Sequence, residues 1–328
     1  MPMTAEPEIS IVVPLYNEVD NVAPLCASII EVMVPWGRSF ELLLVDDGST
    51  DGTAARIEAE VSRDSRLRFF RMNVNSGQTP ALAAGFDAAR GSIIVSMDGD
   101  HQNDPADIPR LVERLDDGVD VVCGWRKRRR DSWLWRTLPS AIANRLVASI
   151  TGVSIHDTGC TLRAYRGEVV RALTIYSDMH RFLPALTSMT GARVEEIEVN
   201  HRPRRHGTSK YGIARTYRVL VDVATIGMLV RFGATPGRWF GVLSVPPFVI
   251  GLISAWLAMR PAAGVEAGRV VLWSLTVMMF YLVASLISLA VLAETALYYS
   301  DRSSLRKLVQ ALVVTPNVGP RRSGRREA

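Results

Sequence analysis

Two aspartates separated by one glycine, Asp98-Gly99-Asp100, directly follow the apolar run 92–97. That run is short, rich in β-branched residues and uncharged, so it predicts a buried strand. Carboxylates at the carboxyl end of a strand in an α/β sheet lie where such sheets bind ligands. Two of them can offer oxygen ligands to one Mg²⁺ or Mn²⁺ ion, which would bridge to a diphosphate and neutralise it as it leaves. A solvated turn is the alternative, because Asp and Gly are common turn residues.

Two earlier strand-like runs, residues 9–13 and 41–45, also end in polar residues. The carboxyl ends of neighbouring parallel strands share one edge of a sheet, so the three strand ends are expected to meet. A carboxylate at this edge can accept hydrogen bonds from a base or a ribose. No G-x-G-x-x-G fingerprint follows the first run, so a dinucleotide site is not indicated. The residues at the first two ends are Pro14, Tyr16, Glu18 and Asp46.

Strand-like and helical segments alternate through the first part of the chain. This alternation predicts an α/β fold with a mostly parallel, Rossmann-like sheet that helices cover on both faces. The expected strands are 9–13, 41–45, 67–71, 92–97 and 120–123, and the expected helices are 21–34, 53–62, 78–90 and 105–115.

Composition narrows the class of protein. The chain has 328 residues and a net charge of +5, and its three cysteines form no C-x-x-C or Cys/His cluster. Neither a zinc site nor a disulfide framework is therefore indicated, and reduced thiols suit a domain that faces the cytosol. The first eight residues contain no apolar run, so no signal peptide is expected.

Two long apolar segments follow, at 239–259 and 270–293. Each has the roughly 20 residues that a helix needs to cross a bilayer, so they predict a C-terminal two-helix transmembrane hairpin. Pro246-Pro247 are expected to kink the first helix. Basic residues are more frequent outside the pair than in the connector 260–269, which predicts that both ends face the cytoplasm. A buried helical hairpin of a soluble protein is the alternative.

A basic run, residues 126–130, leads into Trp133 and Trp135. Cationic charge beside tryptophan suits anionic headgroups, so helices near 132–150 and 213–232 are expected to lie at the membrane interface. A solvated loop is the alternative, and no nucleic-acid partner is expected because no recognition motif accompanies the run. The expected organisation is a cytoplasmic domain over 1–235, two membrane helices within 236–300 and a basic cytoplasmic tail over 301–328.

The three strand-end motifs resemble those of the family 2 glycosyltransferases, which have the GT-A nucleotide-diphospho-sugar transferase fold. Within that family the chain is similar to the polyprenyl-phosphate glycosyltransferases, the group of dolichyl-phosphate mannose synthases. The branch that it most resembles is that of the bacterial undecaprenyl-phosphate 4-deoxy-4-formamido-L-arabinose transferases. Three later motifs carry this likeness: Asp131-Ser132-Trp133, Asp157-Thr158-Gly159-Cys160-Thr161-Leu162-Arg163-Ala164-Tyr165 and Gly207-Thr208-Ser209-Lys210-Tyr211.

The resemblance implies a role for each matching residue. Asp98 and Asp100 would hold Mg²⁺ or Mn²⁺, and the catalytic residues would be Asp100, Asp157 and Arg204. The nucleotide sugar would contact Pro14, Tyr16, Glu18, Asp46, Gly77, Gln78, Asp98 and Gln102, and the phosphates would contact Arg126, Arg204, Ser209 and Lys210. Such a set suits the chemistry, because several cations must hold polyanions together before transfer. Each role has a structural alternative: Asp46 could cap the next helix, and Arg204 could be solvated.

Two departures from related patterns are informative. The family commonly has Asp-Ala-Asp where this chain has Asp98-Gly99-Asp100, and often has Leu where it has His101. Both carboxylates remain, so metal binding is expected to survive. Processive polysaccharide synthases carry Q-x-x-R-W, whereas the matching stretch here, 235–239, lacks the glutamine.

The resemblance implies inverting transfer of a single sugar from a nucleotide-diphosphate sugar to a polyprenyl (undecaprenyl) phosphate. The reaction would take place at the cytoplasmic face of the inner membrane, in a multi-pass protein with both termini in the cytoplasm, and would feed cell-envelope glycan or lipid modification. The expected partners are the donor, the acceptor and the bilayer. The alternatives are a non-catalytic membrane-bound nucleotide-sugar binder and a processive polysaccharide synthase. A homo-oligomer is compatible with the sequence, although no G-x-x-x-G face supports it.

Overall fold

The computed structural model describes residues 6–127, 155–173, 175, 179–188, 191–202, 236–260 and 266–299. The chain divides into two compact units, one within residues 1–224 and one within 225–301. The expected interfacial helices near 132–150 and 213–232, and the tail 301–328, lie outside the described residues.

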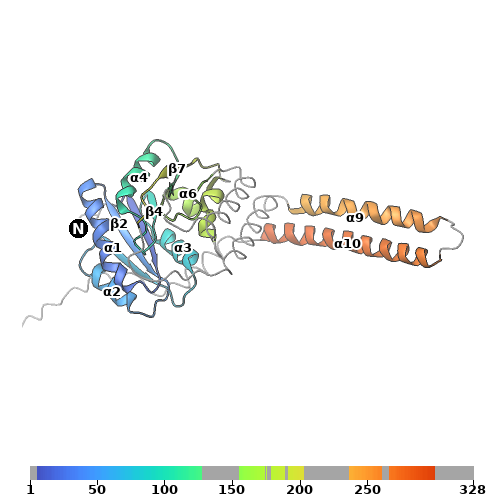
Figure 1. Ribbon diagram of the computed structural model, residues 1–328, viewed down its shortest axis with the longest axis horizontal. Coiled ribbons are helices and arrows are strands. Elements are labelled where there is room, and N and C mark those ends of the chain that lie inside the picture. The colour runs from blue at the N-terminus through green and yellow to red at the C-terminus, as the bar shows by residue number, and fades with distance from the viewer. Residues whose placement is uncertain are drawn as a thin grey trace, which may run out of the picture. The chain divides into compact units, whose positions relative to one another are not determined.

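A single sheet organises the first unit (Figure 1). In the described part of the chain this sheet has seven strands in the order β3-β2-β1-β4-β6-β5-β7. Parallel pairs join β1 to β2 and β4, β2 to β3, and β5 to β7, whereas β6 runs antiparallel between β4 and β5. The strands are β1 (Ile9–Leu15), β2 (Phe40–Asp46), β3 (Leu67–Arg71), β4 (Ile93–Ser96), β5 (Val121–Trp125), β6 (Arg163–Arg166) and β7 (Val194–Glu198). The mostly parallel sheet predicted from the alternation of segments is therefore confirmed.

Helices cover both faces of this sheet, because its strands alternate their side chains between two hydrophobic clusters. In β1, Ile11 and Val13 point into the cluster under α1, α2 and α4, and Val12 points into the cluster under α3, α6 and α7. The helices are α1 (Val19–Trp36), α2 (Thr53–Val61), α3 (Gln78–Ala88), α4 (Ile108–Asp116), α6 (Gly167–Ala172) and α7 (Leu183–Ser188), with 3₁₀ turns η1 (Pro105–Asp107) and η3 (Met179–Phe182).

Helix α1 is apolar and long enough to cross a membrane, yet it belongs to the sheet domain. It buries Val22, Leu25, Ile29 and Met33 in the sheet's core, at the three- and four-residue spacing of an amphipathic helix. The helix ends at Gly37, whose φ of 82° lets its N–H reach the carbonyls of the last turn.

Two long helices, α9 (Pro236–Met259) and α10 (Glu266–Tyr299), make up the described part of the second unit. They pack antiparallel: Ser254 Oγ is hydrogen-bonded to Thr276 Oγ1 at 2.8 Å, and the Gly237 N–H donates to Glu294 Oε1 at 3.2 Å. The helical backbone of α9 continues through Pro246-Pro247.

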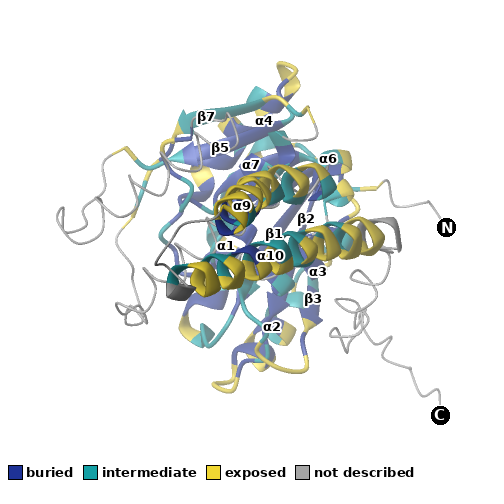
Figure 2. Cartoon of the chain, turned by 90° about the vertical axis from the view of Figure 1, so that its right-hand side faces the viewer, coloured by how far each residue is buried: buried dark blue, intermediate teal, exposed yellow. Residues whose placement is uncertain are grey.

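The outward faces of α9 and α10 are apolar and exposed (Figure 2). Trp256 is 51% exposed and Tyr281 is 74% exposed, and most of the side chains around them are aliphatic. Both helices are long and apolar enough to span a bilayer. Such surfaces are costly in water and suit lipid, so the chain is a membrane protein.

Candidate active site

The carboxyl ends of β1, β2 and β4 meet at one edge of the sheet. In the strand register, Leu15 at the end of β1 lies beside Asp46 at the end of β2, and Val12 lies beside Ser96 at the end of β4. The polar residues predicted to form a site follow these ends directly, so the sheet gathers them at the edge where α/β proteins bind ligands.

The loops after β1 and β2 are joined by hydrogen bonds. Asn17 has a φ of 54°, in the left-handed region; its backbone N–H donates to Ser49 Oγ at 2.8 Å, and its Oδ1 accepts from the Thr50 N–H at 2.9 Å. These bonds hold Tyr16 and Glu18, two predicted nucleotide contacts, next to the end of β2.

Asp46 is fully buried and offers one oxygen to a ligand. Its Oδ1 accepts from the Ser49 N–H at 3.0 Å, while Oδ2 lies 3.4 Å from Arg71 Nε and has no hydrogen-bond partner among the described residues. Buried acceptors without a donor are uncommon because the lost hydrogen bond costs free energy. Asp46 Oδ2 is therefore placed to accept an N–H or O–H from a bound base or ribose.

Asp47, which was not among the predicted site residues, shapes the next loop. Its carboxylate accepts from the Ser76 N–H at 2.8 Å and the Gly77 N–H at 2.9 Å. Burial raises the pKa of Asp47, although these two hydrogen bonds favour its ionised form. The neighbouring Gly48 has a φ of 68°, and a Cβ there would lie 2.7 Å from the Asn75 nitrogen. Asp47 and Gly48 thus fix the loop that ends at Gly77, a predicted donor contact.

The paired carboxylates after β4 are held from both sides by predicted neighbours. Gln78 Nε2 donates to Asp98 Oδ1 at 2.7 Å, and Asp100, which is 8% exposed, accepts from the Gln102 N–H at 3.1 Å. Burial, together with the charge of Asp100, raises the pKa of Asp98 to about 6. The two carboxylates therefore act on each other electrostatically at the site edge.

Both departures from the family pattern have a structural counterpart. A Cβ at Gly99 would lie 2.3 Å from Leu15 Cδ2, so the glycine leaves room for the leucine that ends β1. His101 has a φ of 61° and is buried, and its Nε2–H donates to the Asn21 carbonyl at 3.0 Å. The turn is thereby attached to the first turn of α1.

Asp98 and Asp100 fit a divalent cation. They supply hard oxygen ligands, and their mutual repulsion is the charge pattern that a cation relieves. Within the described residues no three His, Cys, Asp or Glu side chains cluster to hold a metal by themselves. Mg²⁺ is commonly bound by one or two carboxylates together with substrate phosphates, so this pair suits a metal that arrives with a diphosphate.

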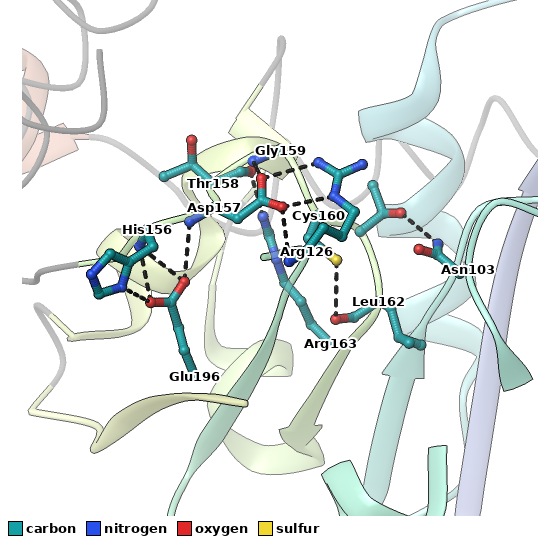
Figure 3. A network of polar contacts seen from close by, with 11 residues as sticks. Asn103, Arg126, His156, Asp157, Thr158, Gly159, Cys160, Leu162, Arg163 and Glu196 are labelled. Carbon is teal, nitrogen blue, oxygen red and sulfur yellow. Dashed lines mark hydrogen bonds and ion pairs between the residues drawn. The ribbon is translucent and has the colours of Figure 1, made fainter. Parts of the chain in front are cut away.

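An ion pair with two parallel hydrogen bonds joins Arg126, directly after β5, to Asp157 (Figure 3). Arg126 Nε lies 2.7 Å from Asp157 Oδ2, and Nη2 lies 3.0 Å from Oδ1. Burial opposes the charge of Arg126, but the bonds to Asp157 outweigh it and raise its pKa. The positive charge of Arg126 also lowers the pKa of Asp98, so the guanidinium acts on the carboxylate pair. Asp157 is thus placed to orient a cation.

A second arginine, which was not among the predicted site residues, connects the loop of Asp157 to η3 and, through it, to α3. Arg163 is 2% exposed; its Nη2 donates to the Thr158 carbonyl at 2.6 Å and its Nη1 to the His180 carbonyl at 2.7 Å. His180 Nδ1 is hydrogen-bonded to Thr79 Oγ1 at 2.7 Å. Since Thr79 follows Gln78 at the start of α3, this chain of contacts links the loop of Asp157 to the helix that carries Gln78.

The segment that leads towards the predicted phosphate-binding residues is attached to the loop after β4. Arg202 donates to Asp104 Oδ2 through Nε at 3.0 Å and Nη2 at 2.7 Å, and the Asn200 N–H donates to Asp107 Oδ2 at 2.7 Å. Three predicted residues, Arg204, Ser209 and Lys210, lie outside the described residues.

Comparison with known proteins identifies the family. The sequence profile of Glycosyl transferase family 2 matches residues 10–174. Dodecaprenyl-phosphate galacturonate synthase of Rhizobium johnstonii is 39% identical over 93% of both chains. Undecaprenyl-phosphate 4-deoxy-4-formamido-L-arabinose transferase of Edwardsiella ictaluri is 34% identical over 93% of this chain and 94% of the relative.

Solved structures show the same fold. Glucosyl-3-phosphoglycerate synthase of Mycobacterium tuberculosis, in complex with Mn²⁺, uridine-diphosphate and phosphoglyceric acid, superimposes with a TM-score of 0.53 at 21% identity, covering 70% of this chain and 79% of that one. Mannosyl-3-phosphoglycerate synthase of Rubrobacter xylanophilus gives a TM-score of 0.55 at 15% identity, over 69% and 75% of the two chains.

The chain belongs to glycosyl transferase family 2, and it is a glycosyltransferase with the GT-A fold. The resemblance to the family that the strand-end motifs indicated is confirmed, and so is the likeness to the polyprenyl-phosphate transferases that the three later motifs indicated.

Proposed function

We propose that this enzyme transfers one sugar from a nucleoside-diphosphate sugar to a polyprenyl phosphate at the cytoplasmic face of the inner membrane. The observation that supports the proposal is the edge of the sheet where the charge of the Asp98 carboxylate interacts with that of its neighbour Asp100 and with that of Arg126. Two relatives that match more than nine-tenths of this chain are named as polyprenyl-phosphate sugar transferases, which also supports the proposal.

The donor's nucleoside would occupy the edge formed by the loops after β1 and β2. Asp46 Oδ2 would accept a hydrogen bond from the base or ribose, and Pro14, Tyr16 and Glu18 would line the same place. This assignment gives the buried Asp46 Oδ2 the hydrogen-bond donor that it lacks among the described residues, beside its ion pair with Arg71.

The donor's diphosphate would lie between the carboxylate pair and Arg126. Asp98 and Asp100 would hold Mg²⁺ or Mn²⁺, which supplies charge neutralisation for the leaving diphosphate. Nε and Nη2 of Arg126 donate hydrogen bonds to Asp157, so the guanidinium would donate to a phosphate oxygen through Nη1. Arg204, Ser209 and Lys210 are proposed to hold the remaining phosphate oxygens. Fixed charges of this kind stabilise the charge that develops in the transition state.

The acceptor needs no strong general base. A phosphate monoester has a second pKa of about 6 and is largely dianionic at neutral pH, so its oxygen can attack the anomeric carbon directly. One displacement at that carbon inverts its configuration and expels the nucleoside diphosphate. The two carboxylate oxygens of Asp157 accept hydrogen bonds from Arg126. Asp157 would therefore orient the Arg126 guanidinium and would not take a proton from the acceptor.

The apolar helices would keep the enzyme where a polyprenyl acceptor resides. We propose that α9 and α10 span the inner membrane with both chain termini in the cytoplasm, and that the segments near 132–150 and 213–232 lie at its surface. The exposed apolar faces of the two helices support the spanning role.

A lipid-extraction assay tests the proposal and names the donor. Detergent-purified enzyme is given undecaprenyl phosphate, Mg²⁺ or Mn²⁺, and radiolabelled UDP-galacturonic acid, UDP-4-deoxy-4-formamido-L-arabinose, UDP-glucose or GDP-mannose, with and without EDTA. We expect one donor to transfer label to the organic phase, and EDTA to abolish the transfer. If folded enzyme that binds nucleotide transfers no label from any donor, the proposal is contradicted and a binding role is favoured.

A further inference from the structure

Glu196, in β7, holds the turn that carries Asp157 (Figure 3). Its Oε1 accepts from the Asp157 N–H at 3.1 Å and from the His156 N–H at 3.0 Å, and its Oε2 accepts from His156 Nδ1 at 2.9 Å. We propose that Glu196 is a positioning residue for sugar transfer: it fixes this turn so that Asp157 presents the Arg126 guanidinium to the donor's phosphates. This inference rests on the proposed function and deepens it.

The hydrogen bonds of Asp157 indicate that Glu196 positions Asp157, which in turn positions Arg126. Its carboxylate is committed to Arg126 and to the Gly159 N–H, which donates to Oδ1 at 3.2 Å. Since Asp157 is only 3% exposed and its oxygens are engaged, its orientation depends on the backbone of its own turn. Two successive N–H groups of that backbone end on Glu196. The contacts therefore run from Glu196 through Asp157 to Arg126.

The sheet makes this connection rigid. Strands β7 and β5 are parallel neighbours, with Glu196 opposite Cys123, and Arg126 follows β5 directly. The His156 ring stacks on Trp125 with centroids 4.6 Å apart and planes 23° apart, which closes the turn over the end of β5. Groups held by packed and hydrogen-bonded neighbours keep the geometry that catalysis requires.

The other glutamates of β7 have different surroundings. Glu195 lies 2.8 Å from Arg114 and 2.8 Å from Arg193, and Glu198 lies 3.5 Å from Lys127. Such surface ion pairs contribute little free energy. In the part of the chain that the structure describes, Glu196 is the one of the three glutamates that is hydrogen-bonded to the turn, which makes Glu195 a matched control on the same strand.

The test compares Glu196→Ala, Glu196→Gln and Glu195→Ala in the full-length enzyme. We expect Glu196→Ala to lower kcat by about tenfold or more, because a small misplacement of a charged group is enough for such a loss. Glu196→Gln should keep most of the activity, since its amide oxygen still accepts the two backbone N–H groups. Glu195→Ala should match the wild type. Equal kcat for Glu196→Ala and wild type would overturn the inference.

A double-mutant cycle separates positioning from a general effect on folding. Arg126→Lys keeps the charge but loses the planar fork that Asp157 orients. If Glu196 acts through Arg126, adding Glu196→Ala to Arg126→Lys should lower kcat by less than about twofold, because coupled residues are not additive. Independent, multiplicative losses would contradict the inference.

A binding measurement keeps this inference distinct from the proposed function. The affinity for UDP and for GDP is measured by calorimetry with Mn²⁺ present, for wild type, Glu196→Ala and Glu195→Ala. Weaker binding by Glu196→Ala alone supports the positioning role even if no sugar transfer is found, in which case only the proposed function fails. Unchanged affinity in the absence of transfer would overturn both.

Discussion

At the scale of single residues, the site concentrates acidic groups at one edge of a sheet. Asp46, Asp100 and Asp157 are each less than 9% exposed, and Asp98 beside them has a raised pKa. Arg71 and Arg126 supply positive charge to two of these carboxylates. The remaining negative charge, on Asp98 and Asp100, is what a divalent cation and its diphosphate would compensate.

The raised pKa of Asp98 makes a prediction about pH. The ordinary pKa of an aspartate is 3.8, and the pKa of Asp98 in the folded protein is about 6. Between these two pH values the folded protein binds more protons than the unfolded chain. The stability of the metal-free protein therefore falls as the pH rises from 3.8 to about 6. Asp98→Asn should therefore raise the thermal midpoint of the metal-free enzyme at pH 7.5, by roughly 2–4 °C, and remove any stabilisation by Mn²⁺. Scanning calorimetry in detergent measures both. An unchanged Mn²⁺ response in the variant would refute the metal role of Asp98.

The close approach of Gly99 to Leu15 makes a second prediction. Gly99→Ala restores the family's usual Asp-Ala-Asp but places its Cβ 2.3 Å from Leu15 Cδ2, so we expect a loss of about 1–3 kcal/mol in the free energy of unfolding. Leu15→Val removes the obstructing atom, so the double variant should recover stability relative to Gly99→Ala. Denaturant unfolding of the four proteins decides this, and additive losses would show that the two side chains are not in conflict.

At the scale of elements, the sequence predicted the segments that have a clear hydrophobic period. The strands β1 to β5 and their helices were expected because each is an apolar run or an amphipathic stretch. Strands β6 and β7 were not expected: β6 is Arg-Ala-Tyr-Arg and β7 is Val-Glu-Glu-Ile-Glu. The polar sequence of β6 does not indicate a buried strand. Arg163 is nevertheless buried, because it donates hydrogen bonds to carbonyl groups that only the folded chain brings near.

The residues of the site also divide into those that the sequence could predict and those that it could not. Residues at strand ends, such as Asp46 and Asp98, could be predicted because topology alone brings strand ends together. Glu196 and Arg163 could not, since their partners are set by a strand order, β4-β6-β5-β7, that no local pattern reveals. Asp47 adjoined a predicted residue, but its role depends on a loop 29 residues further along the chain.

The bond between Arg202 and Asp104 gives a prediction at this scale. Arg202 is 44% exposed, so Arg202→Met should change the free energy of unfolding by less than about 1 kcal/mol. Transfer should nevertheless slow by roughly tenfold, because this bond fixes the segment that leads to Arg204. Arg110→Met, which removes another exposed ion pair at 2.9 Å from Asp107, is the control and should keep full activity. Similar rates in the two variants would contradict the positioning of this segment.

At the scale of the whole molecule, a nucleotide-sugar domain and a pair of apolar helices occur in one chain. Transfer to a soluble acceptor would not require a pair of helices with exposed apolar faces of this kind. An acceptor with a long isoprenoid tail would, because it stays in the bilayer while its phosphate reaches the membrane surface.

Deleting residues 236–328 tests this relation. We expect the shortened chain to lose transfer to undecaprenyl phosphate in vesicles by at least about tenfold, because it loses its effective concentration at the membrane. Transfer to a short, water-soluble prenyl phosphate should persist. Equal activity of both forms on the long acceptor in vesicles would show that the helices have another role.

The most direct measurement is mass spectrometry of the lipid product made by wild type and by Asp100→Ala. We expect a polyprenyl phosphate that carries one sugar, with one nucleoside diphosphate released for each lipid formed, and no product from a folded Asp100→Ala enzyme. A polymer on the lipid, or product from Asp100→Ala at the wild-type rate, would contradict it.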